Sequence, residues 1–245
     1  MSGRLIGIGT GPGDPELLTL KAVRALAAAD VVAHFAKAGR SGNARATVQG
    51  FLRADVVELP LLYPVTTELP ANGAGYGGAI AGFFAAAAAA VEGHLATGRT
   101  VAVLSEGDPL FYGSYMHLHV RLAPRWPAEV VPGVTAMSGS WSQAGLPLVQ
   151  GDEVLTVLPG TLPEGEMARR LADSPASVIM KVGRNLPRIR RALAAAGKLA
   201  RAVYVERATM ERTVTTPLAE KGDDLAPYFS IVLVPGWEGR PCAGG

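Results

Sequence analysis

Three segments of this chain each run from a short apolar stretch through glycine and proline into a stretch with helical periodicity. They begin at Leu5, Thr100 and Ala128. A short apolar run bounded by glycine is typical of a buried strand, and strands that alternate with helices predict a mainly parallel α/β sheet. The carboxyl ends of parallel strands meet at one edge of a sheet, where ligands usually bind. These turns therefore constrain both the fold and the position of a site.

The first turn reads GIGTGPGDP over residues 7–15. Asp14 can cap a helix that begins at Pro15, because proline lacks the N–H that would have no partner there. Backbone amides at such a helix start often hold an anion. The dinucleotide fingerprint is absent, since Pro12 stands where its third glycine is required, and so is the lysine of a P-loop. A tight turn without a ligand is an equally good interpretation of these residues alone.

The second turn, residues 105–113, concentrates carboxylates and aromatic rings beside a glycine that permits close backbone approach. A simple helix cap at Asp108 and Pro109 is the alternative interpretation. The third turn, residues 130–136, repeats the order strand, Pro-Gly, helix, and several such turns in one sheet favour a binding cleft over unrelated turns. The residues of interest in the second turn are Glu106, Gly107, Asp108, Phe111 and Tyr112.

Strand and helix patterns alternate along the chain and predict two α/β domains with mainly parallel sheets. We expect strands at 5–8, 29–32, 56–59, 100–104 and 128–131, and then at 154–158, 177–181, 202–206, 212–216 and 229–234. Helices are expected at 15–26, 78–98, 114–122, 134–144, 165–172 and 187–196. Pro124, Trp126 and Pro127 interrupt the pattern, which places the boundary near residues 120–127 and the domains at 1–120 and 127–240.

The composition favours a globular protein without a nucleic-acid partner. Of the 245 residues 49% are hydrophobic and 18% charged, and a net charge of +2 argues against a long electrostatic footprint. The single Cys242 provides neither a disulfide framework nor a cysteine metal site, which fits a reducing compartment. The N-terminus does not resemble a signal peptide, and the longest apolar stretch, 79–91, is shorter than the ~20 residues of a membrane helix. We therefore expect a soluble, cytoplasmic protein.

Histidines and arginines carry less information. His117 and His119 lie on different sides of an expected helix and cannot easily share a metal, and His34 and His94 are isolated, so no metal site is expected. An arginine cluster follows the strand at 177–181. A solvated helix face is its default interpretation, but a polycarboxylate substrate would also require such a patch. The cluster consists of Arg184, Arg188, Arg190 and Arg191.

Together the three turns resemble the hallmark segments of the tetrapyrrole (corrin/porphyrin) methylase family. These segments are GIGTGPGDPELLTLKA from Gly7, EGDPLFYG from Glu106 and VVPGVTA from Val130, in the order and spacing of the family. The resemblance extends over nearly the whole chain. Further segments resemble the branch that methylates precorrin-2 at C20 in vitamin B12 synthesis. They lie at residues 151–153, 180–184, 203–207 and 227–230.

This resemblance implies two α/β domains, with S-adenosylmethionine bound as methyl donor in a cleft between them. It implies a homodimer that converts precorrin-2, a tetrapyrrole, to precorrin-3A. By motif, the cofactor contacts would be Pro12, Glu106, Gly107, Asp108, Phe111, Thr135, Ala136, Met180 and Ala208. Precorrin-2 carries several carboxylates, and Arg184 is the expected substrate-binding residue.

The base that removes the C20 proton is not assigned by the resemblance. Uroporphyrinogen methylases of the family carry a Tyr-Asp-Arg segment after the second strand, whereas this chain has His34-Phe35-Ala36 there. The difference counts against uroporphyrinogen as substrate. A carboxylate in an apolar cleft suits a base, so Asp108 is the first candidate and Tyr112 the second.

Several alternatives stay open. The chain could methylate cobalt-precorrin-2 or another ring carbon, or it could be a diphthamide or ribosomal-RNA methylase of the same superfamily. The near-neutral charge weakens the RNA interpretation. A non-catalytic nucleotide-binding module belongs to another class, and it would need no cleft between two domains.

Overall fold

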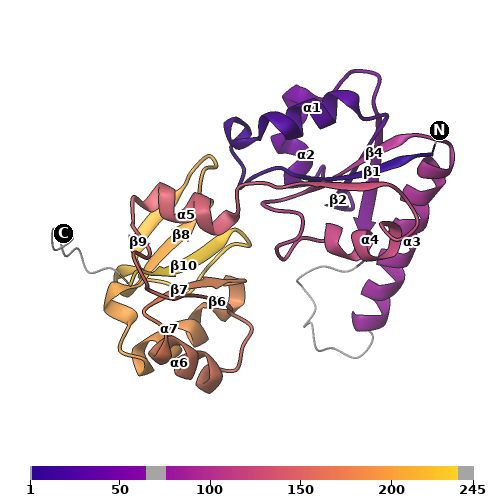
Figure 1. Ribbon diagram of the computed structural model, residues 1–245. Helices are drawn as coiled ribbons and strands as arrows, with labels where there is room; N and C mark the ends of the chain where they lie inside the picture. Colours follow the sequence, from indigo (N-terminus) through magenta and orange to yellow (C-terminus); the bar gives the residue numbers. More distant parts are fainter. Residues whose placement is uncertain (1, 65–75, 237–245) are drawn as a thin grey trace. The chain divides into compact units, whose positions relative to one another are not determined.

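The computed structural model describes residues 2–64 and 76–236 and divides into two compact units, Met1–Thr135 and Ala136–Gly245 (Figure 1). Each unit contains one five-stranded sheet with helices on both faces. This architecture confirms the α/β class and the two-part organisation expected from the sequence.

The sheet of the first unit is entirely parallel. Its strand order is β3-β2-β4-β1-β5, which places β4 at the centre with β1 beside it. The turns that follow β4 and β1 are therefore neighbours at the carboxyl edge of the sheet. The strands are β1 (Arg4–Gly9), β2 (Val31–Lys37), β3 (Val57–Tyr63), β4 (Thr100–Ser105) and β5 (Ala128–Val131).

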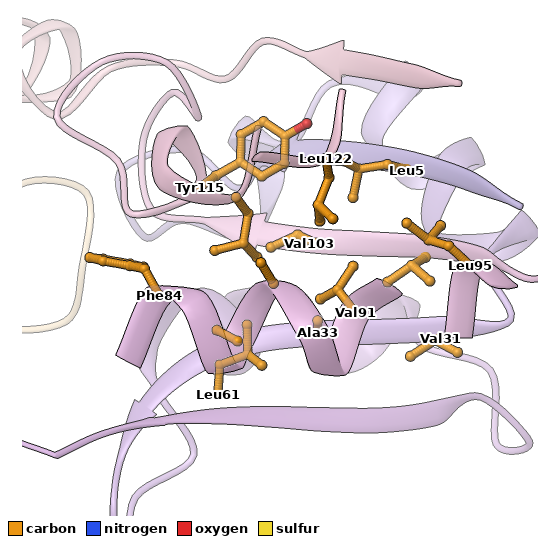
Figure 2. Close-up of a cluster of buried hydrophobic side chains, with 14 residues drawn as sticks. Leu5, Val31, Ala33, Leu61, Phe84, Val91, Leu95, Val103, Tyr115 and Leu122 are labelled. Carbon is orange, nitrogen blue, oxygen red and sulfur yellow. The ribbon is translucent and has the colours of Figure 1, made fainter. Parts of the chain in front are cut away.

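Alternate side chains of the first sheet enter two separate cores. Leu5 of β1 belongs to the cluster under helices α3 and α4, and its neighbour Ile6 to the cluster under α1 and α2. Figure 2 shows the first cluster, where Val91 and Leu95 of α3 lie over the strands. The helices are α1 (Leu20–Ala28), α2 (Asn43–Thr47), α3 (Tyr76–Ala96) and α4 (Tyr115–Leu122), with 3-10 turns η1 (Pro15–Leu17) and η2 (Gln49–Phe51).

Helix α3 is longer than the apolar stretch that the sequence analysis considered. By length and composition its part Gly78–Ala96 could cross a membrane, and 28% of the most apolar window is buried in the protein. Phe84, Ala88, Val91 and Leu95 form a stripe that packs on the sheet. One such helix is weak evidence for a membrane span, because a helix that covers a globular core passes the same test.

The sheet of the second unit is mixed, although parallel pairings prevail over the two sheets taken together, as expected. Its order is β6-β7-β10-β8-β9; β6 and β7 pair in parallel, and the other three pairings are antiparallel. Residues 207–213 join β8 to β9 and are too few for a crossover helix. β6, β7 and β8 still share one direction, so the turns after them lie at one edge. The strands are β6 (Leu155–Pro159), β7 (Ala176–Met180), β8 (Val203–Glu206), β9 (Val214–Pro217) and β10 (Ser230–Val234).

Helices cover both faces of the second sheet. Helix α5 contacts β8 and β10 on one face, and α6 and α7 pack together on the other. The apolar face of each helix supplies the buried residues, such as Leu171 and Ile189. The helices are α5 (Ala136–Ala144), α6 (Glu164–Asp173) and α7 (Leu186–Ala195), with 3-10 turns η3 (Gly183–Asn185), η4 (Leu199–Arg201) and η5 (Leu218–Glu220).

Two local boundaries differ from the sequence analysis. Strand β5 pairs with β1, so residues 128–131 belong to the first unit, and the prolines near 124–127 only interrupt the connection from α4 to β5. Asp14 does act as a cap, accepting a hydrogen bond from the Glu16 N–H at 2.8 Å, but it caps the short turn η1. The α-helix begins later, at Leu20, where Thr19 is the cap.

Two substitutions test which face of α4 is buried in the core. Leu118→Ala should lower the free energy of unfolding by about 2–5 kcal/mol, because Leu118 is fully buried in the core. Val120 is 65% exposed, so Val120→Ala should change that free energy by less than about 0.5 kcal/mol. Urea unfolding measures both. Equal losses from the two substitutions would contradict the orientation of the helix.

Candidate functional site

Backbone hydrogen bonds join the turns after β1 and β4. The Gly107 N–H donates to the Gly11 carbonyl at 2.8 Å, and the Gly11 N–H donates back at 3.3 Å. The Thr10 N–H donates to the Ser105 carbonyl at 2.9 Å. Pro12 directly follows this bridge and Glu106 directly precedes Gly107. The structure thus brings together the predicted cofactor residues of the first two turns.

The third turn reaches the same place because glycines leave room for it. A Cβ atom on Gly133 would lie 2.2 Å from the Gly107 carbonyl oxygen, and one on Gly9 would lie 2.5 Å from the Gly133 nitrogen. No side chain could occupy either position without moving a backbone. Gly107 also has a φ of +63°, in the left-handed region that favours glycine. The three turns therefore contact one another through the backbone atoms of their glycines.

The carboxylate of Asp108 is engaged at this junction. Its Oδ1 accepts a hydrogen bond from the Leu110 N–H at 2.9 Å, and its Oδ2 accepts one from the Gly133 N–H at 3.2 Å. The first bond closes the second turn, as Asp side chains often do, and the second bond ties that turn to the third. Asp108 lies where the sequence placed it, with both oxygens bonded to backbone.

Glu106, two residues earlier, has a different environment. Its Oε1 accepts a hydrogen bond from Asn43 Nδ2 at 3.1 Å. Its Oε2 has no hydrogen-bond partner among the described residues, and the Glu106 residue as a whole is half-buried. Burial raises the pKa of the Glu106 carboxyl, and the bond from Asn43 offsets part of that rise.

Asn43 is a site residue that the sequence analysis missed. It is the first residue of the short helix α2, which was not expected. It contacts Glu106 across 63 positions of sequence, because β2 and β4 are adjacent and their carboxyl ends lie together. No local pattern around residue 43 signals this contact.

Phe111 and Tyr112 place two rings on the second turn. The rings meet edge to face, with centroids 4.9 Å apart. Tyr112 has a φ of +56°, a conformation that costs of order 1–3 kcal/mol in a residue other than glycine. Tyr112 as a residue is 45% exposed, so the second turn presents it to solvent. Backbone strain of this kind concentrates at ligand-binding sites.

In the second unit, three predicted cofactor residues surround one apolar cluster. Ala136, Met180 and Ala208 are partly buried against the cluster that α5 forms with the sheet. Met180 ends β7 and Ala208 follows β8, at the edge where these parallel strands end. Thr135 is the last residue of the first unit. The predicted contacts thus form one group in each unit.

The loops after β7 and β8 have an unusual backbone. Lys181 follows β7 with a φ of +55°, and Arg207, Thr209 and Arg212 follow β8 with φ of +49°, +63° and +61°. Left-handed conformations are uncommon for residues other than glycine. Four of them at one edge of a sheet support a functional interpretation of these loops.

The arginine cluster contains three paired residues and one that is available. Arg188 donates to the Gly160 carbonyl at 3.0 Å, Arg190 pairs with Asp224 at 2.9 Å, and Arg191 pairs with Glu164 at 2.8 Å. Arg184 is exposed in η3 and has no ion pair among the described residues. The sequence analysis treated these four alike, and the structure leaves Arg184 available to a ligand carboxylate.

The histidine segment 34–36 lies within β2 and does not follow it. His34 is buried, its Nδ1 has no hydrogen-bond partner among the residues that the structure describes, and burial lowers its pKa. Within residues 2–64 and 76–236, no group of three or more His, Cys, Asp or Glu side chains could hold a metal ion. Cys242 lies outside the described residues.

The junction of the three turns can be tested through its glycines. Gly133→Ala should lower the free energy of unfolding by about 1–3 kcal/mol, because the new methyl group overlaps the Gly107 carbonyl. Gly82 lies in α3 with open space around it, so Gly82→Ala should stabilise the protein by about 0.5–1 kcal/mol. Denaturant unfolding measures both. A neutral Gly133→Ala would show that the turns are not in contact.

Comparison with known proteins agrees with this arrangement. The family model of Tetrapyrrole (Corrin/Porphyrin) Methylases matches residues 4–222. A Sinorhizobium sp protein named precorrin-2 C(20)-methyltransferase is 72% identical over 98% of both chains, and the cobalt-precorrin-2 C(20)-methyltransferase of Salmonella typhimurium is 32% identical over 96% of this chain and 97% of its own. The structure of uroporphyrin-III C-methyl transferase from Thermus thermophilus, complexed with S-adenyl homocysteine, is 26% identical with a TM-score of 0.67, covering 96% of this chain and 98% of that one. The chain therefore belongs to the tetrapyrrole (corrin/porphyrin) methylase family.

Proposed function

We propose that this protein transfers a methyl group from S-adenosylmethionine to C20 of precorrin-2, giving precorrin-3A in cobalamin biosynthesis. The observation that carries this proposal is the 72% identity, over 98% of both chains, to a protein named for that reaction. The three joined turns give the proposal a site, since they carry the motif residues in the geometry described above.

The described residues are of types that can bind S-adenosylmethionine. S-adenosylmethionine supplies an electrophilic methyl group on a sulfonium. The glycines at 107 and 133 let the motif-bearing turns meet closely, and Phe111 and Tyr112 offer aromatic surface. In the second unit Ala136, Met180 and Ala208 pack against one apolar cluster. We propose that these residues, with Pro12, Glu106, Asp108 and Thr135, hold the donor.

The contribution of the protein to this reaction is to align the methyl donor with the acceptor carbon. Methyl transfer to carbon is an in-line displacement, and fixed orientation of two reactants contributes up to about 7–11 kcal/mol to lowering a barrier. A junction of three turns fixed by backbone hydrogen bonds is suited to that task, because its groups do not need to reorganise on binding. The sheet provides the rigid support.

A second candidate substrate is cobalt-precorrin-2. The 32% identity to the Salmonella typhimurium enzyme named for it supports this reading, although the metal-free substrate is favoured by the higher identity to the Sinorhizobium protein. We further propose that the protein acts in the cytoplasm, which its single cysteine favours, and that it forms the homodimer that the family resemblance implies. The placement of the donor between the two units stays a prediction.

The proposed reaction can be tested directly under anaerobic conditions. Incubation with methyl-labelled S-adenosylmethionine and precorrin-2 should give a labelled product, and carbon NMR should place the label at C20. Parallel incubations with cobalt-precorrin-2 and with uroporphyrinogen III show which substrate is preferred. Methylation of uroporphyrinogen III alone, or at another carbon of precorrin-2, would refute the proposal.

The role of Arg184 can be tested against a matched neighbour. Arg184→Ala should raise the substrate Kd by about tenfold, the loss of one charge-assisted hydrogen bond, and leave donor affinity unchanged. Arg191→Ala should change neither, because Arg191 is paired with Glu164. Titration of each variant with substrate and with donor gives both constants. Equal substrate affinity in the two variants would assign Arg184 to a solvated surface.

A further inference from the structure

We propose that Glu106 is the general base that removes the C20 proton and that Asn43 is its positioning residue. The proposal rests on the proposed function, since it assigns a role in that reaction. It moves the base from Asp108, the first candidate from the sequence, to the neighbouring carboxylate in the same turn. The reason is how the oxygens of the two side chains are bonded.

Asp108 is held by backbone N–H groups at both of its carboxylate oxygens, which makes it a weaker candidate for the base. Its Oδ1 and Oδ2 each accept an N–H, and one of these bonds connects the second and third turns. Protonation of Asp108 would weaken the junction that holds the site together. A residue with this bonding is suited to positioning the loops.

Glu106 has the bonding expected of a base. Asn43 Nδ2 donates to one oxygen, Oε1, at 3.1 Å, and Oε2 has no hydrogen bond to the described residues. The turn itself is held by the Gly11–Gly107 bridge, so the side chain projects from a rigid backbone. A base must lie within hydrogen-bond reach of its proton, and a carboxylate with one anchored and one open oxygen meets that requirement.

The electrostatic environment supports the same assignment. Burial raises the pKa of Glu106, and a carboxylate with a higher pKa is a stronger base at neutral pH. No cation contributes to the shift; the one opposing influence is the hydrogen bond from the uncharged Asn43 amide. An arginine or lysine in place of Asn43 would have made the carboxylate a weaker base.

The proton transfer balances as follows. C20 provides the electron pair for the new carbon–carbon bond, and the bond from the methyl carbon to sulfur breaks with its pair going to sulfur. The ring then carries one positive charge and both a hydrogen and a methyl group at C20. The Glu106 carboxylate takes that proton, the C–H electron pair returns to the conjugated ring, and the neutral acid later releases the proton to water.

Glu106→Gln tests the proposal because it keeps the size and the Asn43 bond but cannot accept the proton. At saturating donor and substrate, turnover should fall by about 10²–10⁴-fold, with the substrate Kd and the melting temperature unchanged. Deuterium at C20 of the substrate should slow the variant further, since proton removal becomes rate-limiting. Glu106→Ala should regain activity when formate is added, because formate supplies the missing carboxylate.

Asn43 and an unrelated carboxylate provide the controls. Asn43→Ala should lower kcat less than Glu106→Gln and leave KM unchanged, and its effect should vanish in the Glu106→Gln background, because it acts through Glu106. Glu220 is exposed in η5, so Glu220→Gln should retain full activity.

Each contrary outcome is distinct. Normal turnover of Glu106→Gln, or a loss explained by weaker donor binding, would overturn the assignment of the base. If the Glu106 variants lose activity without formate rescue and without an isotope effect, Glu106 has a structural role and is not the base. If the wild-type protein methylates neither precorrin-2 nor cobalt-precorrin-2, the proposed function fails, and the role of Glu106 in that reaction fails with it.

Discussion

Close approach of three backbone turns is the constraint on which the first unit depends. Parallel pairing of β5, β1 and β4 brings the turns after these strands to one edge of the sheet, and glycine at positions 9, 107 and 133 lets them touch. Because contact is made through backbone atoms, hydrogen bonds between the turns replace side-chain packing. These hydrogen bonds hold the three turns in fixed positions, which suits a protein that must orient two reactants.

The same junction separates the roles of two carboxylates that are close in sequence. Asp108 is drawn into the contact by the Gly133 amide and becomes part of the support. Glu106 lies on the other side of Gly107, where Asn43 at the start of α2 donates to one of its oxygens and no described group bonds to the other. Hydrogen bonding thus gives two chemically similar carboxylates different roles, one in holding the turns and one in proton removal.

The second unit reaches a similar arrangement with a different sheet. β10 inserts in the reverse direction between β7 and β8, yet β7 and β8 remain parallel, and their ends carry Met180 and Ala208 beside one apolar cluster. The strained loops that follow carry exposed cations, of which Arg184 has no ion pair within the described residues. Ion pairs on α7 occupy its neighbours, so helix position decides which arginine stays available.

The sequence by itself determined the α/β class, the strands at the glycine turns, the family and the motif residues, because strand and helix periodicity and turn glycines are local patterns. It did not determine the pairing of the second sheet, the first-unit position of β5, or the contact between Asn43 and Glu106. Those depend on strands and loops far apart in the chain, as the 63 positions between Asn43 and Glu106 illustrate. Which carboxylate oxygen stays open was likewise decided only in the tertiary structure, because it depends on which distant N–H groups the fold brings within reach.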